Sequence, residues 1–166
     1  MPEQPLASRM ARPEDYDPIA AVVNDWWGGR DILPALPRLF LDHFHRTSLV
    51  IDPPGGPAGS GPAADAAPGV PLAFLIGILS PSQAELAYIH FVGVAPAARG
   101  RGLARQLYAE FFELARADGR RAVCAITAPV NTGSIAFHRQ LGFAVTGPVA
   151  DYEGPGRDYV LFRRAL

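Results

Sequence analysis

The stretch that most constrains the fold is 92–104, where an apolar segment passes through a proline-marked turn into an amphipathic helix. The segment before the turn, 86–94, has the apolar character of a buried strand. The segment after it, 104–117, carries apolar side chains every three or four residues, which predicts a helix. Gly100 and Gly102 stand in the turn between them. A chain built around a strand that turns directly into a helix is a mixed α/β domain.

The same patterns extend the prediction over the rest of the chain. Strands are expected at 5–11, 48–51, 72–79, 86–94, 122–127, 143–149 and 158–163, and helices at 13–27, 36–46, 104–117 and 134–141. The length of 166 residues fits one domain, 1–166. More than half of the positions in 52–71 are Gly or Pro, which predicts a mobile loop insertion between two strands rather than a domain linker.

Composition excludes several classes of function. The net charge of -1 gives no electrostatic reason to expect nucleic acid or an anionic membrane as a partner. All 15 basic residues are arginine, so the sequence offers neither a phosphate-loop lysine nor a Schiff-base lysine. The single cysteine, Cys124, rules out an internal disulfide and is interpreted as a buried, inert thiol. No metal site is expected, because His43 and His45 lie two apart on a predicted helix and point to different faces.

The sequence shows neither a signal peptide nor a membrane span. Its first residues lack a basic region followed by an apolar stretch. The longest apolar run, 70–79, is too short to cross a bilayer. We therefore expect a cytoplasmic protein.

The turn at 99–104 has the chemistry of a phosphate site. A helix N-terminus presents unpaired N–H groups and the positive end of the helix dipole. Glycines let the backbone approach an anion closely, and Arg99, Arg101 and Arg105 add charge-assisted donors. The dinucleotide fingerprint is excluded, because Arg105 stands where its third glycine is required. The alternative is an ordinary strand–helix turn with solvated arginines.

Two motifs in this order carry a resemblance to a known family. Arg99-x-x-Gly102-x-Ala104 resembles the acyl-CoA pyrophosphate motif of the GNAT superfamily of N-acetyltransferases, and 131–143 is similar to the later strand–helix–strand segment of that family. The resemblance is firm over 72–147, whereas the N-terminal third matches only in its pattern of strand, two helices and strand.

The resemblance implies a fold and a cofactor. The fold is α/β (mixed α+β), with a central mixed, mostly antiparallel sheet of about six or seven strands, about four flanking helices, and splayed central strands that hold CoA. Acetyl-CoA is implied as co-substrate, and the backbone N–H of Val94 would polarise its thioester carbonyl. The residues implied to bind it are Val92, Val94, Arg99, Gly100, Arg101, Gly102, Leu103, Ala104, Asn131, Ser134, Phe137 and His138.

Catalytic groups are less closely defined by the resemblance. Many family members have a tyrosine where this chain has His138, which either donates a proton to the leaving thiolate or simply packs beside the cofactor. Tyr88 stands about where several members have a carboxylate base, and His90 is the better base by its usual pKa. Glu85 could act through a water molecule, although a solvated loop acid is the ordinary alternative.

The acceptor site is expected from the segments around 25–31 and 151–158, where the resemblance places its walls. Trp26, Trp27, Tyr88 and Tyr152 are the candidate substrate-binding residues. Both segments carry more carboxylates than arginines, which hints at a cationic acceptor, whereas solvated acidic loops are the simpler explanation.

The expected function is transfer of an acetyl group from acetyl-CoA to a primary amine by direct attack in a ternary complex, without a covalent acyl-enzyme. The first alternative is a non-catalytic acyl-CoA sensor on the same fold, and the second is a protein-interaction module. A homodimer remains open, because dimers are common in the family.

Overall fold

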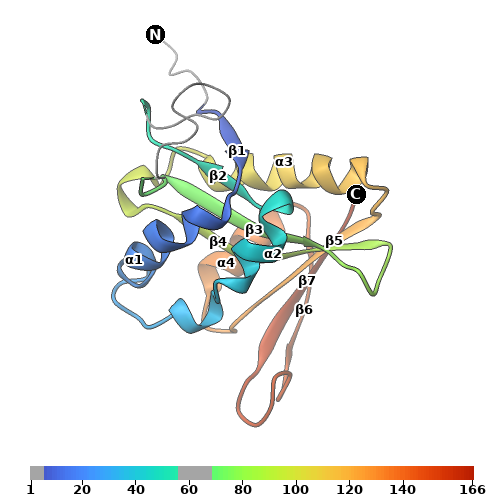
Figure 1. Ribbon diagram of the computed structural model, residues 1–166. Coiled ribbons are helices and arrows are strands. Elements are labelled where there is room, and N and C mark those ends of the chain that lie inside the picture. Colours follow the sequence, from blue (N-terminus) through green and yellow to red (C-terminus); the bar gives the residue numbers. More distant parts are fainter. Residues whose placement is uncertain (1–5, 56–68) are drawn as a thin grey trace. The chain divides into compact units, whose positions relative to one another are not determined.

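The computed structural model describes residues 6–55 and 69–166. Figure 1 shows seven strands and four α-helices, with both types of element in each half of the chain. The strands are β1 (Ser8–Met10), β2 (Leu49–Ile51), β3 (Ala73–Leu79), β4 (Leu86–Val94), β5 (Ala122–Thr127), β6 (Ala144–Val149) and β7 (Tyr159–Ala165). The α-helices are α1 (Tyr16–Trp26), α2 (Leu39–Phe44), α3 (Leu103–Ala117) and α4 (Thr132–Gln140), and short 3₁₀ turns lie at Pro13–Asp15, Leu33–Ala35, His45–Thr47 and Pro96–Ala98.

The strands form one mixed sheet in the order β1-β2-β3-β4-β5-β7-β6. The pairs β1–β2, β2–β3, β5–β7 and β6–β7 are antiparallel. β4 and β5 are parallel, and their ladder pairs Leu86–Tyr88 with Ala122–Cys124. The predicted class, a mostly antiparallel mixed sheet with about four helices, is confirmed.

Most predicted elements are present, but the second helix is shorter than expected. The pattern predicted 36–46, whereas α2 covers only Leu39–Phe44. Pro37 disfavours helical geometry in the residue before it, and Leu36 indeed has φ -125° and ψ 65°. At the other end the chain tightens into the 3₁₀ turn His45–Thr47. Most of the predicted loop insertion, 56–68, lies outside the described residues.

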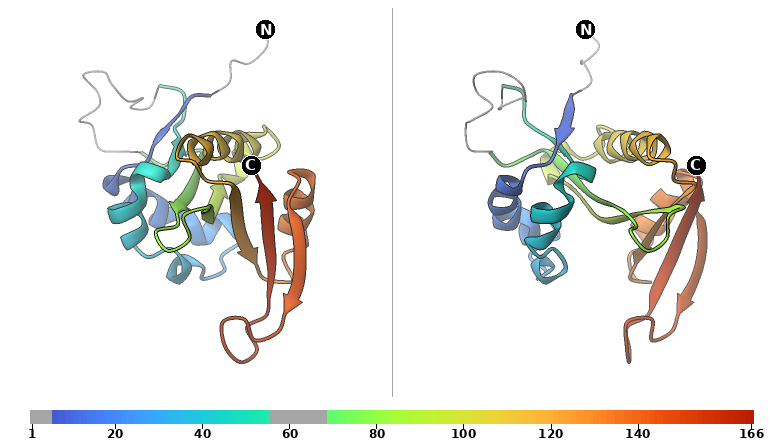
Figure 2. Two further views of the ribbon diagram at one scale, coloured as in Figure 1. Left: turned by 90° about the vertical axis from the view of Figure 1, so that its right-hand side faces the viewer. Right: turned by 45° about the vertical axis from the view of Figure 1, so that its right-hand side comes forward.

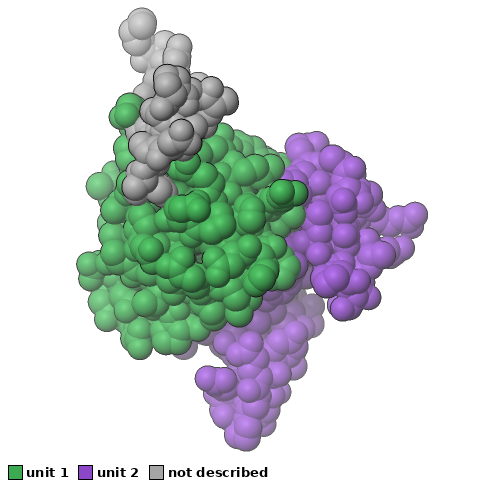
Figure 3. Space-filling model, in the orientation of Figure 1, with its two compact units in different colours: residues 1–77, 91–111 green, residues 78–90, 112–166 purple. Residues whose placement is uncertain are grey.

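Contacts divide the chain into two compact units, shown in Figure 3. Unit 1 comprises residues 1–77 and 91–111, and unit 2 comprises 78–90 and 112–166. The expectation of a single domain stays a prediction.

Unit 1 packs helices on both faces of its strands, as the views in Figure 2 show. Ile19 and Val23 on α1 recur at helical spacing and pack with Phe74 and Ile76, which share one face of β3. Gly77 faces the other side, where a Cβ would lie 2.2 Å from the ring of Phe111 on α3. Only glycine therefore lets α3 approach β3 this closely.

Unit 2 is built on β5, β7 and β6, with α4 covering one face. Successive residues of β7 point to opposite faces. Phe162 faces α4 and packs in an aromatic cluster with Phe143. Leu161 and Arg163 face the opposite side, where a cavity lies. The β6–β7 hairpin is the orange-to-red ribbon in Figure 2.

Candidate active site

The turn before α3 has the backbone geometry of an anion cradle. Gly100 and Gly102 both have φ +79°, a conformation that only glycine adopts without strain. A Cβ at either position would meet no atom within 4 Å, so the space beside the turn is open. Gly102 accepts the first helical hydrogen bond from Gln106, at 3.0 Å. The first N–H groups of a helix have no partner within it, so they point toward this space.

Arg99 makes contacts that the sequence did not indicate. Its Nη2 donates to the carbonyl of Trp26 at 2.5 Å, and its Nε donates to the carbonyl of Val94 at 3.3 Å. The guanidinium thus joins the C-terminal end of α1 to the end of β4 within unit 1. Arg101 and Arg105, by contrast, belong to the exposed surface.

The two tryptophans of unit 1 have different surroundings. Trp26 is buried, with its ring 5.9 Å from that of Phe74. Trp27 is half-buried and packs on Phe91 of β4 with ring centroids 5.2 Å apart. Trp26 is therefore a core residue, and Trp27 is the one that remains a candidate for contact with an acceptor.

In unit 2, the side chain of Asn131 caps the N-terminus of α4. Asn131 caps the helix, since its Oδ1 accepts from the backbone N–H of Ser134 at 3.2 Å. Its Nδ2 donates to Thr127 Oγ1 at 3.1 Å. Both polar ends of the Asn131 amide, which the resemblance implied to bind acetyl-CoA, thus have intramolecular partners here. Phe137 is half-buried on the same helix.

His138 is enclosed by aromatic rings. It is 5% exposed, and its imidazole stacks on Phe162 with centroids 3.9 Å apart and an interplanar angle of 5°. Its Nδ1 donates to the carbonyl of Ser134 at 2.7 Å. Burial lowers the pKa of His138, and the hydrogen bond to Ser134 only partly opposes this. A neutral ring whose one N–H is already bonded favours a packing role over proton donation to a thiolate.

The lowered pKa of His138 makes the stability of the folded protein decrease as the pH falls. Because folding lowers the pKa of His138, a proton binds this imidazole more tightly in the unfolded chain. The contribution of the neutral His138 ring to the free energy of unfolding is therefore fully present above about pH 6.5 and is lost as the pH falls. We expect His138→Phe to flatten the fall in Tm between pH 7.5 and 5.5, measured by calorimetry. A change of about 1 kcal/mol moves Tm by ~2–4 °C in a chain of this size. The exposed His43→Gln serves as control, and an unchanged slope in His138→Phe would contradict the assignment.

Tyr88 and His90 lie on the same face of β4, with ring centroids 6.4 Å apart. Burial, and to a lesser degree the acidic groups Tyr152 and Glu153, raise the pKa of Tyr88 to about 12. Tyr88 is therefore a neutral phenol near pH 7 and a hydrogen-bond donor, not a base. Of the two candidates, the imidazole of His90 is better suited to accept a proton. Glu85 is exposed and faces Arg121 at 3.8 Å, as expected of a solvated acid.

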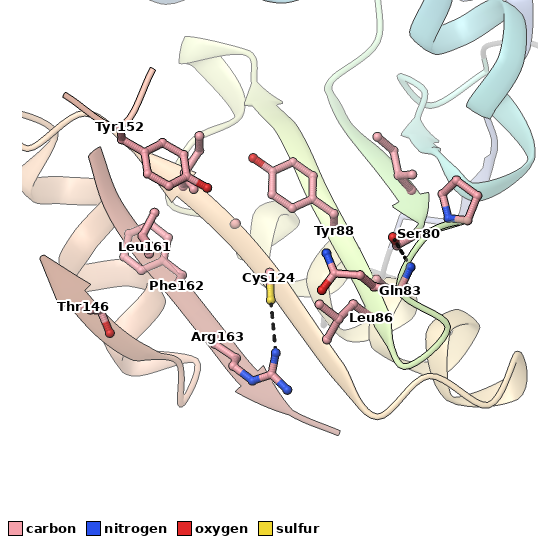
Figure 4. A pocket seen from close by; sticks show the side chains of 15 residues that line it. Ser80, Gln83, Leu86, Tyr88, Cys124, Thr146, Tyr152, Leu161, Phe162 and Arg163 are labelled. Carbon is pink, nitrogen blue, oxygen red and sulfur yellow. Dashed lines mark hydrogen bonds between the residues drawn. The ribbon is translucent and has the colours of Figure 1, made fainter. Parts of the chain in front are cut away.

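A cavity of about 550 Å³ lies on the open face of unit 2. Figure 4 shows Tyr88 and Tyr152 on facing walls with their hydroxyl ends turned toward each other, and Arg163 and Cys124 further along. The cavity is lined by Ile78, Ser80, Pro81, Gln83, Leu86, Ala87, Tyr88, Cys124, Ala125, Ile126, Thr146, Tyr152, Leu161, Phe162 and Arg163. Its volume is in the range of small-molecule sites.

Cys124 does not lie where the sequence predicted, and it lies beside Arg163, which the sequence did not indicate as a site residue. It was expected to be a buried core thiol, whereas it is only partly buried and lines the cavity. Arg163 Nη1 lies 3.8 Å from its sulfur. The two residues come together only through the β5–β7 register. The only sequence feature that pointed to Arg163 is the alternation along 161–163, which places Leu161 and Arg163 on one face of the strand and Phe162 on the other.

The acidic residues of the β6–β7 connection bond within that connection. The backbone N–H of Asp151 donates to the carboxylate of Asp158 at 2.9 Å, and that of Gly156 donates to the carboxylate of Asp151 at 2.7 Å. These contacts favour loop-stabilising acids over a cationic acceptor site. Tyr152, 48% exposed, packs beside Tyr159 with ring centroids 5.9 Å apart.

Within 6–55 and 69–166, no helix is long and apolar enough to cross a membrane. The same ranges hold no cluster of three His, Cys, Asp or Glu side chains arranged for a metal ion.

Comparison with known proteins gives a family match. The family model described as the acetyltransferase (GNAT) family matches residues 22–143. An L-methionine sulfoximine/L-methionine sulfone acetyltransferase of Pseudomonas aeruginosa is 41% identical over 58 residues, which are 35% of this chain and 34% of that protein. The chain thus matches about a third of the length of this curated relative.

Solved structures share the fold over nearly the whole chain. A GNAT-family protein from Desulfovibrio desulfuricans superposes with a TM-score of 0.75 at 18% identity, covering 96% of this chain and 98% of that one. A protein from Salmonella typhimurium, solved with its cofactor acetyl-CoA, gives a TM-score of 0.68 at 21% identity, with coverage of 97% and 94%.

Proposed function

The chain belongs to the acetyltransferase (GNAT) family, and on that premise we propose that it transfers an acetyl group from acetyl-CoA to a primary amine by direct attack in a ternary complex. The observation that carries the proposal is the turn before α3. Two glycines with φ +79° and open space beside them lead into the N-terminus of a 15-residue helix. Such a turn suits a pyrophosphate, because its N–H groups and the helix dipole both favour an anion.

The residues available for acetyl-CoA fit this role. Backbone groups of Arg99–Ala104, with the side chain of Arg101, would hold the pyrophosphate. Backbone groups of Val92 and Val94 would hold the pantetheine arm and orient the thioester. The contacts with acetyl-CoA that the resemblance implies for Asn131, Ser134 and Phe137 stay predictions, and the amide of Asn131 is already hydrogen-bonded within unit 2.

Acetyl-CoA supplies a thioester, whose acyl carbon forms the new C–N bond while the C–S bond breaks and CoA leaves as a thiolate. The chain must remove a proton from the amine, since an alkyl ammonium has a pKa near 10.4 and deprotonating it at pH near 7.4 costs roughly 4 kcal/mol. His90 would accept that proton directly or through a water molecule. Tyr88, a neutral phenol, would donate a hydrogen bond beside it. His138 would keep α4 in place rather than transfer a proton.

The acceptor is proposed only as a primary amine, with amino acids first in line for testing. The curated relative is named for L-methionine sulfoximine and L-methionine sulfone. These two compounds therefore belong in the first acceptor panel. A cytoplasmic location and a homodimer stay predictions.

Calorimetric titration with acetyl-CoA, followed by CoA-release assays over the amine panel, tests the proposal. We expect saturable binding in the micromolar range, which corresponds to about -8 kcal/mol. Turnover of at least one amine should accompany it. Binding without turnover of any amine would favour the non-catalytic sensor, and absence of binding would refute the cofactor assignment.

His90→Ala is expected to separate chemistry from cofactor binding. Loss of a general base lowers turnover by about 10²–10⁴-fold. The Kd for acetyl-CoA should stay within about twofold, because the proposed CoA contacts involve other residues. His43→Ala, on the exposed side of α2, is the matched control. Turnover equal to that of the unmodified protein would eliminate His90 as the base.

A further inference from the structure

The cavity of unit 2 contains one charged side chain. Of the residues that line it, Arg163 alone carries a charge, and the others are apolar side chains, hydroxyls, a thiol and an amide. In Figure 4 the guanidinium of Arg163 lies beside Cys124, at the opposite end from the two tyrosines. A cavity that is otherwise neutral and lined largely by apolar side chains, with one cation, is complementary to a small molecule that carries one negative charge and an apolar body.

Arg163 has no anionic partner in the described part of the chain. The one side-chain hydrogen bond of Arg163 there goes to the sulfur of Cys124, at 3.8 Å from Nη1, and a thiol is a weak acceptor. A guanidinium has five N–H donors in a planar fork that matches a carboxylate. Most of the hydrogen-bonding capacity of this side chain is therefore available to a ligand in the cavity.

The register of the sheet places this cation close to the candidate catalytic residues. Tyr88 of β4 pairs with Cys124 of β5, and Cys124 pairs with Arg163 of β7, so the three form one row across adjacent strands. Strands lie about 4.8 Å apart, which separates the Cα atoms of Tyr88 and Arg163 by ~10 Å. The Arg163 side chain reaches back over Cys124 and shortens that gap. His90 follows Tyr88 on the same face of β4.

We propose that this cavity receives the amine acceptor, and that Arg163 selects acceptors bearing a carboxylate close to the amine, that is, free amino acids with apolar side chains. The proposal rests on the proposed acetyl transfer. Arg163 would bind the carboxylate, the side chain would lie against Leu86, Ile126 and Leu161, and the amine would face Tyr88 and His90. Arg163 is thus assigned as a specificity-determining residue that makes no contact with the transferred acetyl group.

The first test compares matched acceptors. L-methionine, L-leucine and L-phenylalanine are each assayed beside the corresponding amide, which keeps the amine and side chain but lacks the negative charge. We expect kcat/KM to favour the acids by about 10- to 100-fold, the usual value of a charge-assisted hydrogen bond. Arg163→Gln should remove this preference, mainly through a higher KM for the acids.

Arg121→Gln is the matched control, because it removes the same charge from unit 2 at an exposed position outside the cavity. It should keep the preference for acids. Equal turnover of acids and amides by the unmodified protein would overturn the proposal while leaving the proposed acetyl transfer in place. A preference that survives in Arg163→Gln would overturn the assignment of Arg163.

The second test does not depend on turnover. Cys124 is the single cysteine of the chain and lines the cavity, so its alkylation by iodoacetamide reports on occupancy at one position. We expect L-methionine to slow this alkylation at least threefold, L-methioninamide to have little effect, and Arg163→Gln to abolish the protection. If none of L-methionine, L-leucine and L-phenylalanine slows the alkylation of Cys124, the proposal is overturned even if acetyl-CoA binds and other amines are acetylated. If no amine is acetylated, the proposed function fails, and this assay still decides whether the cavity binds amino acids.

Discussion

Replacing Gly102 by glutamate is expected to lower the affinity for acetyl-CoA by at least ~100-fold. The backbone at this position has φ +79° and faces open space at the start of α3, where we propose that the pyrophosphate binds. A carboxylate about 4 Å from a phosphate oxygen, at an effective dielectric constant near 20, costs roughly 4 kcal/mol, which would exceed a hundredfold loss. Calorimetric titration of the variant with acetyl-CoA measures the effect.

The other end of the same helix offers a matched control. Gly119 has φ +80°, and a Cβ there would likewise meet no atom within 4 Å. Gly119→Glu therefore introduces the same charge and a similar backbone strain of about 1–3 kcal/mol. It should bind acetyl-CoA normally and lose only stability. If both variants retain the original affinity, the turn before α3 is not the pyrophosphate site.

Asp15→Ala is expected to destabilise unit 1 by about 3–5 kcal/mol, the usual result of removing one partner from a buried ion pair. Asp15 is 2% exposed and binds the guanidinium of Arg9 through both of its oxygens at 2.8 Å. One oxygen also accepts from the backbone N–H of Arg12 at 2.7 Å. Arg9 would keep Asp52 as a partner, which places the effect toward the lower end of the range.

Urea unfolding measures this loss, with Asp17→Ala as the control. Asp17 also pairs with an arginine, Arg38, but its side chain is 76% exposed. Exposed pairs contribute about 0–1 kcal/mol. If Asp15→Ala loses no more stability than Asp17→Ala, then burial of the Arg9–Asp15 pair adds nothing to the free energy of unfolding.

Local patterns predicted the elements of the fold well, because those patterns act over short stretches. The strands at 86–94 and 122–127 have the predicted bounds. The error at α2 came from treating apolar spacing as sufficient where Pro37 fixed the start. The geometry of the glycine turn before α3 was also predictable, since positive φ and a helix start are encoded by neighbouring residues.

The cavity could not be predicted from sequence, because it depends on pairing between distant strands. Cys124 and Arg163 are 39 residues apart and meet only through the antiparallel register of β5 and β7. The enclosure of His138 by Phe162 has the same origin. The sequence pointed to His138 as a residue of interest, but only its neighbours show that its ring is buried and already hydrogen-bonded.

Arg99, the first residue of the Arg99-x-x-Gly102-x-Ala104 motif, makes two hydrogen bonds that fix its side chain. The carbonyls of Trp26 and Val94 fix the guanidinium before any ligand arrives, and they use only part of its five donors. A side chain that is already immobilised loses little rotamer entropy when it meets an anion, so it is preorganised for binding. The same side chain ties the end of α1, which Trp27 directly follows, to this turn. One arginine therefore holds the end of α1 and the turn before α3 together, so a substitution at Arg99 would disturb both segments at once.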